Sequence, residues 1–234
     1  MKFKNINIIL LSLIVVYFNY CTFNSKNKPM TKNSSNNSME IFHPSTDTII
    51  KPGFPRDISI NYLGDNNYSF KLSQNIIKKA GLANIANGYD SIFIRLFYIY
   101  SFDSRVQIIE INKNDSMWFG TYKLIYFQLE KMDSILSIQG LSIKKQPKNG
   151  WPTFSQTLFK LNITTLPDDS TIPEFDKGPA DGNFVIVEVS TKKLYRLYSY
   201  INPNYFKDIP EAKSIEAIMS FIDEEFEIER IRPI

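Results

Sequence analysis

The chain of 234 residues contains one cysteine, Cys21, and one histidine, His43, and these two shortages exclude several kinds of chemistry. A structural zinc site needs about four Cys or His ligands, and a disulfide needs two cysteines. A Cys–His nucleophile pair needs both residues on one rigid scaffold, whereas Cys21 follows an apolar leader and His43 lies in a polar stretch. We therefore expect no zinc, no cofactor and no catalysis by cysteine or histidine.

Glycine and proline are also scarce, with 9 and 12 copies, which excludes a collagen-like or linker-dominated chain. Hydrophobic residues make up 43% of the sequence, enough for a sizeable core. The 18 Phe and 13 Tyr favour β structure, because aromatic side chains pack well on a pleated surface.

The small positive charge of +3 is unevenly placed along the chain. Residues 1–57 hold seven basic and three acidic side chains, whereas the remainder holds twenty basic and twenty-one acidic ones. A nucleic-acid-binding protein is expected to carry its positive charge on the folded domain. We therefore do not expect nucleic acid to be a partner.

Residues 1–21 have the pattern of an export signal. Lys2 and Lys4 precede an apolar stretch, Ile8–Phe18, that is short for a membrane span, and Cys21 follows almost at once. This arrangement resembles a bacterial lipoprotein leader, in which the cysteine becomes the acylated first residue. Because small residues are missing directly before Cys21, an uncleaved anchor over Ile6–Phe23 and a plain secretory signal stay open. The expected location is the cell envelope, with attachment to the membrane through the lipid or the leader.

Residues 22–57 are predicted to be a disordered polar tether. The stretches 24–29 and 32–38 are almost free of aliphatic side chains, so they cannot bury enough surface to offset the cost of ordering. His43 lies in this tether, and ligand or catalytic roles need rigid neighbours, so we interpret it as a solvated residue.

Residues 58–234 are predicted to form a single α+β domain. Its expected architecture is an antiparallel meander of about four strands plus a C-terminal hairpin, with helices packed on one side. Thr153 and Gln156 have the spacing of a helix capping box. The hydrophobic patterns predict helices over 70–80, 153–161 and 210–226, and strands over 91–102, 105–112, 118–129, 135–143, 184–190 and 194–200.

An acidic loop between the helix predicted over 153–161 and the C-terminal hairpin is one candidate site. Its carboxylates include Asp168, Asp169, Asp176 and Asp181. Hard cations favour several such oxygens, but the spacing does not match a calcium-binding loop. Three interpretations stay open: a solvated loop, a weak calcium site, or a source of one carboxylate of a catalytic pair. In the last case the two carboxylates of the pair would need to face each other across a cleft.

The final hairpin concentrates aromatic residues and is the second candidate site. Tyr195, Tyr198 and Tyr200, with Arg196 among them, could present a face that binds a peptide or glycan, because tyrosine combines a flat apolar ring with a polar tip. The competing interpretation is that these side chains pack within the domain. Glu188 and Arg196 are predicted to form a cross-strand ion pair.

The chain also resembles uncharacterised exported lipoprotein-like proteins of Bacteroidota-type bacteria, a resemblance that implies an α+β domain and brings no activity or catalytic residues. The motifs that carry it are Gly150-Trp151, Leu166-Pro167-Asp168, Asp181-Gly182, Glu188-Val189, Tyr195–Tyr200, Asn202-Pro203 and the terminal helix from Glu211.

The leader, the tether and the missing catalytic residue types together favour an envelope-tethered, non-enzymatic domain that binds an unidentified protein, peptide or glycan. Two alternatives stay open. One is a carboxylate-dependent enzyme acting on envelope glycans, with the acidic loop, Glu110 or Glu188 as the source of its carboxylates. The other is an inhibitor of the toxin-immunity type.

If Cys21 is acylated, cells grown with labelled palmitate incorporate the label into the wild-type chain, and Cys21→Ser abolishes that incorporation. The measurement is the label recovered with the immunoprecipitated protein. Persistent labelling of Cys21→Ser would exclude acylation at this position.

Overall fold

The computed structural model describes residues 40–43, 50–59, 68–100, 103–131, 134–179 and 182–231, and for 40–41, 127–131, 134–138 and 177 it describes the backbone alone. All of these residues belong to one unit, residues 37–234. The leader and Cys21 lie outside the described residues.

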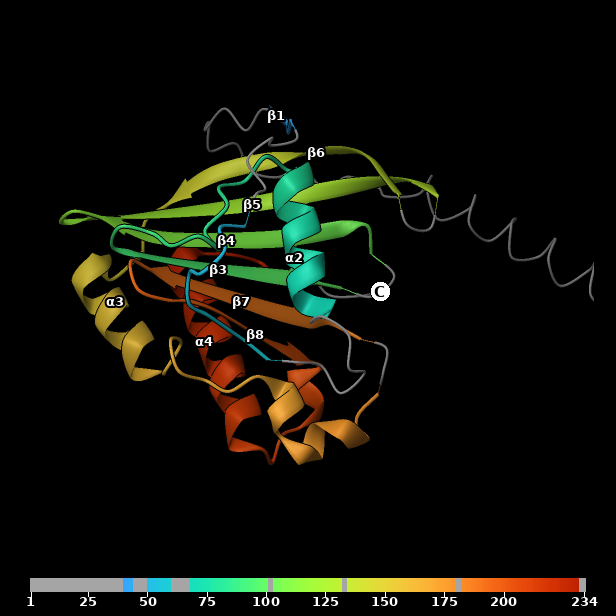
Figure 1. Ribbon diagram of the computed structural model, residues 1–234. Coiled ribbons are helices and arrows are strands. Elements are labelled where there is room, and N and C mark those ends of the chain that lie inside the picture. Colours follow the sequence, from blue (N-terminus) through green and yellow to red (C-terminus); the bar gives the residue numbers. More distant parts are fainter. Residues whose placement is uncertain are drawn as a thin grey trace, which may run out of the picture. The chain divides into compact units, whose positions relative to one another are not determined.

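Strands and helices lie close to the positions predicted from the hydrophobic pattern, and two short strands precede them (Figure 1). In chain order the elements are β1 (Glu40–Ile41), β2 (Arg56–Ile58), α2 (Tyr68–Lys79), β3 (Ile92–Ile99), β4 (Arg105–Asn114), β5 (Met117–Lys131), β6 (Ser134–Lys145), α3 (Gly150–Lys160), the 3-10 turns η1 (Asp169–Thr171) and η2 (Pro173–Lys177), β7 (Phe184–Thr191), β8 (Tyr195–Ile201), η3 (Pro203–Tyr205) and α4 (Pro210–Phe226).

The strands form one sheet in the order β1-β6-β5-β4-β3-β7-β8-β2. The predicted meander is β3 to β6, and the predicted hairpin is β7 and β8, which joins the meander because β7 pairs with β3. All neighbouring strands are antiparallel except β2 and β8, which are parallel. The α+β class is confirmed, and the sheet contains more strands than predicted.

Helices cover both faces of the sheet, so the prediction that they pack on one side is wrong (Figure 1). One core cluster joins α3 and α4 to the face of β3 that carries Ile94 and Leu96. The other cluster joins α2 to the opposite face, which carries Phe93 and Phe97. The pattern of β3 concealed this arrangement because Arg95, which marked a polar face in the sequence, is fully buried.

Helix α3 begins earlier than predicted, and its start is not the expected capping box. Gly150 is its first residue and Asn149 precedes it, so Thr153 and Gln156 lie inside the helix. Glu225 of α4 accepts hydrogen bonds from both the backbone and the side chain of Asn149, at 3.0 and 2.5 Å. The start of α3 is therefore held by a residue far away in the sequence, which local spacing cannot reveal.

Two segments of the predicted tether pair with the sheet, so the folded part begins before residue 58. Strand β1 pairs with Gln139 and Gly140 of β6, and β2 pairs with Tyr195 to Leu197 of β8. Arg56 fixes β2 further, because its guanidinium donates to the carbonyl of Ala86 at 3.0 Å. His43 is exposed, as the tether interpretation required.

Within the part of the chain that the structure describes, no helix combines the length and the apolar character needed to cross a membrane.

The core between α3 and α4 predicts the effect of one truncation. Phe154 is 0% exposed and stacks on Phe226 and Phe221 at centroid distances of 5.0 and 5.3 Å. Phe154→Ala is expected to lower the free energy of unfolding by about 3–5 kcal/mol, because it opens a cavity in a closely packed cluster. Urea denaturation measures the loss. Phe159→Ala on the same helix is the matched control: Phe159 is 38% exposed, and an equal loss there would contradict this account.

Candidate functional site

The first two aspartates of the acidic loop bind the backbone of β8. The carboxylate of Asp168 accepts hydrogen bonds from the backbone of Ser199, at 2.8 Å, and of Ser170. Asp169 accepts one from the backbone of Ile201 at 2.8 Å. Both aspartates are buried, at 2% and 8% exposure, so their oxygens serve the fold and do not face solvent.

The rest of the loop does not complete a cation site with them. Asp176 is exposed on η2, and Asp181 lies outside the described residues. Over the described ranges, no three Asp, Glu, His or Cys side chains come close enough to hold a metal ion. The calcium interpretation of the loop therefore gains no support from the arrangement of Asp168, Asp169 and Asp176.

The tyrosines of β8 are buried and do not form the predicted binding surface. Tyr195, Tyr198 and Tyr200 are each 0% exposed. The hydroxyls of the latter two donate to the carbonyls of Ile163 and Pro167, at 2.7 and 2.8 Å. Sequence alternation alone could not show this, because the connection after α3 covers Tyr198 and Tyr200, whereas Tyr195 is buried on the opposite face, with the residues of α2.

Arg196 also binds the connection that follows α3. The predicted ion pair between Arg196 and Glu188 is not formed. The guanidinium of Arg196 donates to the carbonyls of Thr164 and Leu166 and pairs with Asp57 at 2.8 Å. In the hairpin register Arg196 lies opposite Val189, whereas Glu188 lies opposite Leu197. The two charged side chains therefore alternate to opposite faces.

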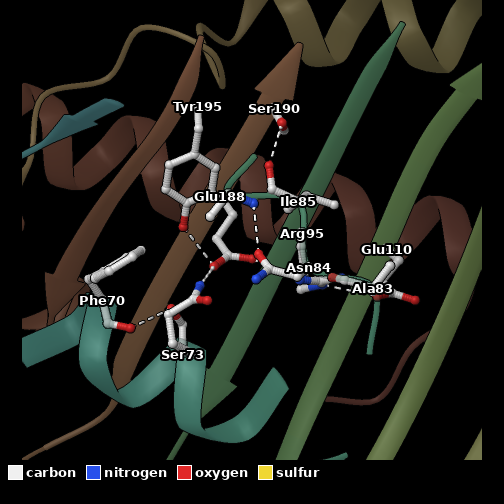
Figure 2. Close-up of polar contacts among 12 residues, drawn as sticks. Phe70, Ser73, Ala83, Asn84, Ile85, Arg95, Glu110, Glu188, Ser190 and Tyr195 are labelled. Atoms are coloured by element: carbon white, nitrogen blue, oxygen red, sulfur yellow. Dashed lines mark hydrogen bonds and ion pairs between the residues drawn. The ribbon is translucent and has the colours of Figure 1, made fainter. Parts of the chain in front are cut away.

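Glu188 belongs to a buried charge cluster on the α2 face of the sheet (Figure 2). Arg95 lies directly opposite Glu110 on one neighbouring strand and Glu188 on the other, and pairs with each at 2.9 Å. Lys123 binds the second oxygen of Glu110 at 2.7 Å, and Tyr195 donates to Glu188 at 2.8 Å. The cluster thus balances two positive against two negative charges.

The electrostatics of the cluster follow from this balance. Burial opposes the charge of Arg95, but the two carboxylates outweigh it and its pKa is raised. Burial likewise opposes ionisation of Glu110, and Arg95 and Lys123 outweigh it, so that the pKa of Glu110 is lowered. Paired, buried charges of this kind are a structural arrangement with no open position for a substrate. Glu110 and Glu188 are therefore not the carboxylate pair of a glycan-cleaving enzyme.

An open cleft lies on the other face, between α4, the ends of β3 and β7, and the segment that follows α4. Its volume is about 630 Å³, within the usual range of ligand sites. Glu227 ends α4 in the left-handed conformation, with φ of 51°, and directs the chain back along the helix. Gln107 then anchors this segment, donating to the carbonyl of Glu229 and accepting from the amide of Ile231. None of Asp168, Asp169, Glu110 or Glu188 lines this cleft.

Charged side chains gather on the α4 wall of this cleft, which we call the α4 cleft. Arg230 binds Oδ2 of Asp223 and lies 3.5 Å from the carboxylate of Glu216. It also donates to the hydroxyl of Ser220 at 3.1 Å, and its guanidinium lies 5.9 Å from the ring centre of Tyr98. Arg230 is thus fully engaged by groups of the protein.

Two residues of the α4 cleft contact each other: the hydroxyl of Tyr98 hydrogen-bonds the carboxylate of Asp223, which acts to lower the pKa of that carboxylate. Tyr98 is buried, with 1% of its surface exposed. The two groups are close enough for each to shift the pKa of the other. Burial raises the pKa of Asp223 to about 6 against the opposing charge of Arg230.

Sequence reasoning missed this site because its members come from distant segments. Asp223 and Glu216 looked like part of the solvated face of the last helix, and Tyr98 like one member of an alternating strand. The available signal was Arg230, a basic residue placed one helical turn beyond an otherwise acidic helix end.

Comparison with known proteins adds no relative: no family model, no curated protein and no solved structure matches this chain.

The buried acidic loop predicts how stability depends on pH. Burial, with the charge of Asp168, raises the pKa of Asp169 to about 7, so the folded state holds this proton more tightly than the unfolded chain does. The free energy of unfolding should therefore fall as pH rises from about 5 to about 7. Asp169→Asn should make this fall shallower, leaving the part due to Asp223.

Chemical denaturation at several pH values measures this dependence. Asp208→Asn is the control, because Asp208 is exposed and the variant should keep the wild-type profile. An unchanged slope in Asp169→Asn would contradict a raised pKa at Asp169.

Proposed function

We propose that this protein is an envelope-tethered, non-enzymatic domain that binds its ligand in the α4 cleft. The leader with Cys21 supports the tether. The observation that carries the binding role is the open cleft itself, about 630 Å³ in volume, which brings charged side chains of α4 together with apolar walls. The ligand is a small molecule or the end of a larger partner such as a peptide or glycan.

The walls of the cleft support a ligand that is partly apolar. Beside the charged side chains, the lining includes Phe184, Val185, Met219, Ile228 and Ile231. Binding sites of this kind combine mainly apolar walls with a few polar groups that orient the ligand. An apolar part of the ligand would contact these side chains, while its polar part faces the charged side chains of the α4 wall.

A binding role accords better with this geometry than catalysis does. Arg230 holds Oδ2 of Asp223 and lies beside Glu216, so both carboxylates of the wall share one guanidinium. Neither is then placed as a free acid and base on opposite sides of a substrate, which glycoside hydrolysis requires.

A fragment library screened against the full-length chain in detergent tests this function through methionine methyl resonances. Met219, 5% exposed in the cleft wall, should shift on binding, whereas Met117, 63% exposed on β5, should not. Ser220→Trp places a bulky ring at an exposed position of the cleft lining, and it should abolish the Met219 shifts.

Lys213→Trp, two helical turns earlier and outside the cleft lining, is the matched control and should keep the shifts. Fragments that bind without perturbing Met219, or that bind Ser220→Trp as well as the wild type, would overturn a ligand site in the α4 cleft.

A further inference from the structure

We propose that the turn between β4 and β5 docks onto a lipid surface that carries anionic headgroups. The surface concerned, which we call the docking end, consists of residues 89–92, 113–120, 144–149 and 191–194. It is separate from the α4 cleft, whose lining includes none of these residues. The inference therefore goes beyond the proposed binding function and does not depend on it.

The strand register places these four segments at one end of the sheet. Ile92, the first residue of β3, lies opposite both Lys113 of β4 and Thr191 of β7. The β4–β5 turn and the β7–β8 turn also lie close together, because Asn114 of the first and Lys192 of the second line one small cleft. Segments far apart in the sequence thus contribute to one continuous surface.

The β4–β5 turn projects beyond the strands on either side of it (Figure 1). Asn114 and Met117 form the last pair of this hairpin. The pairing of β4 with β3 ends at Lys113, and the pairing of β5 with β6 begins only at Gly120. Among the described residues, 117–119 therefore pair with β4 alone. A turn that projects in this way can enter a soft layer without any rearrangement of the sheet.

Three consecutive apolar residues follow this turn. Met117 is 63% exposed and Phe119 is 41% exposed, while Trp118 between them is half-buried. An exposed apolar run of this length is unfavourable in water and is normally found only where it has a function. Because side chains alternate along a strand, Trp118 and Phe119 point to opposite faces of the hairpin. A protein partner would have to reach around both faces to cover them, whereas a lipid layer surrounds an inserted turn on all sides.

Trp118 is also the centre of an aromatic group that continues the apolar surface onto α3. Its ring stacks on Trp151 at a centroid distance of 6.0 Å and lies 6.2 Å from Phe159, which is 38% exposed. The amine of Lys113 lies 5.8 Å from the centre of the Trp118 ring. Tryptophan and lysine side chains suit the boundary between water and lipid, because each combines an apolar body with a polar end.

The charge of the docking end favours anionic headgroups. Its four segments contain six lysines and two aspartates: Lys113, Lys144, Lys145, Lys148, Lys192 and Lys193 against Asp90 and Asp115. One further acid reaches this end, Glu227, which pairs with Lys148 at 3.7 Å. Residues 58–234 as a whole are nearly neutral, so positive charge is concentrated here. Each lysine held near an anionic membrane strengthens binding about fivefold.

Tryptophan fluorescence measures this docking, because the chain contains only two tryptophans, Trp118 and Trp151, and both belong to the aromatic group. The full-length chain is reconstituted into vesicles of phosphatidylcholine, alone or with an equal amount of phosphatidylglycerol, so that the leader can insert into both. In the anionic vesicles the emission should shift to shorter wavelength. Lipids brominated on their acyl chains, which quench only at short range, should quench it there. The ratio of docked to undocked chain should be at least about tenfold lower in the neutral vesicles.

Lys192→Glu combined with Lys193→Glu tests the charge without changing the aromatic group. Both lysines are exposed in the β7–β8 turn, so the fold should be kept, while the docked ratio in anionic vesicles should fall at least about tenfold. Lys207→Glu combined with Lys213→Glu is the matched control. These two lysines are exposed beyond the far end of β8, and their reversal should leave the quenching at its wild-type level.

Met117→Ser tests insertion of the turn itself. Since Met117 is mostly exposed, the free energy of unfolding should stay close to the wild-type value. The docked ratio should fall about fivefold, because less apolar surface enters the lipid. Tyr126→Ser, at a 38% exposed position toward the other end of the same strand, is the control and should dock as the wild type does.

The outcomes separate the possible occupants of this surface. Equal quenching in neutral and anionic vesicles, or undiminished quenching of Lys192→Glu with Lys193→Glu, would overturn docking by charge. Absence of quenching in anionic vesicles would overturn lipid docking altogether, and an emission shift caused by soluble alginate instead would assign the surface to an acidic glycan. None of these results bears on the α4 cleft, because its reporter, Met219, lies outside the docking end.

Discussion

The buried pairing of Arg95 with Glu110 and Glu188 is the interaction on which the arrangement of the sheet depends. These residues lie directly opposite one another on three adjacent strands, on the α2 face of the sheet, and all three are buried. Losing one partner of a buried ion pair costs about 3–5 kcal/mol, so a slip in strand register would be strongly penalised. The central strands are therefore fixed in register by charge as well as by hydrophobic packing, and the two layers of helices are positioned by them.

Much of this architecture could be predicted from local pattern. The stripe of Ile215, Ile218 and Ile222 is enough to place α4, and alternation is enough to place β3 and β7. The same rules failed at Arg95, because a charged residue in an alternating strand ordinarily indicates a solvated face. Strand β2 was missed for another reason: it is three residues long and is ordered by β8, far away in the sequence.

The candidate site was less predictable than the fold. Asp168 and Asp169 were candidate ligands because they are clustered carboxylates. In the folded chain, however, each accepts a hydrogen bond from the backbone of β8, which is distant in the sequence. The α4 cleft joins Tyr98 to Asp223 and Arg230 across more than half of the folded chain. No spacing rule connects these positions, because the cleft arises from the turn at Glu227 and the return of the chain along the helix.

The hydrogen bonds that Asp168 and Asp169 accept from β8 have a consequence for how this protein behaves at high local concentration. Strand β2 covers β8 only as far as Leu197. Beyond it, the amides of Ser199 and Ile201 would be free to pair with a strand of a neighbouring molecule, as exposed sheet edges do. The side chains of Asp168 and Asp169 occupy those donors. Occupied donors of this kind disfavour edge-to-edge pairing between neighbouring copies at this side.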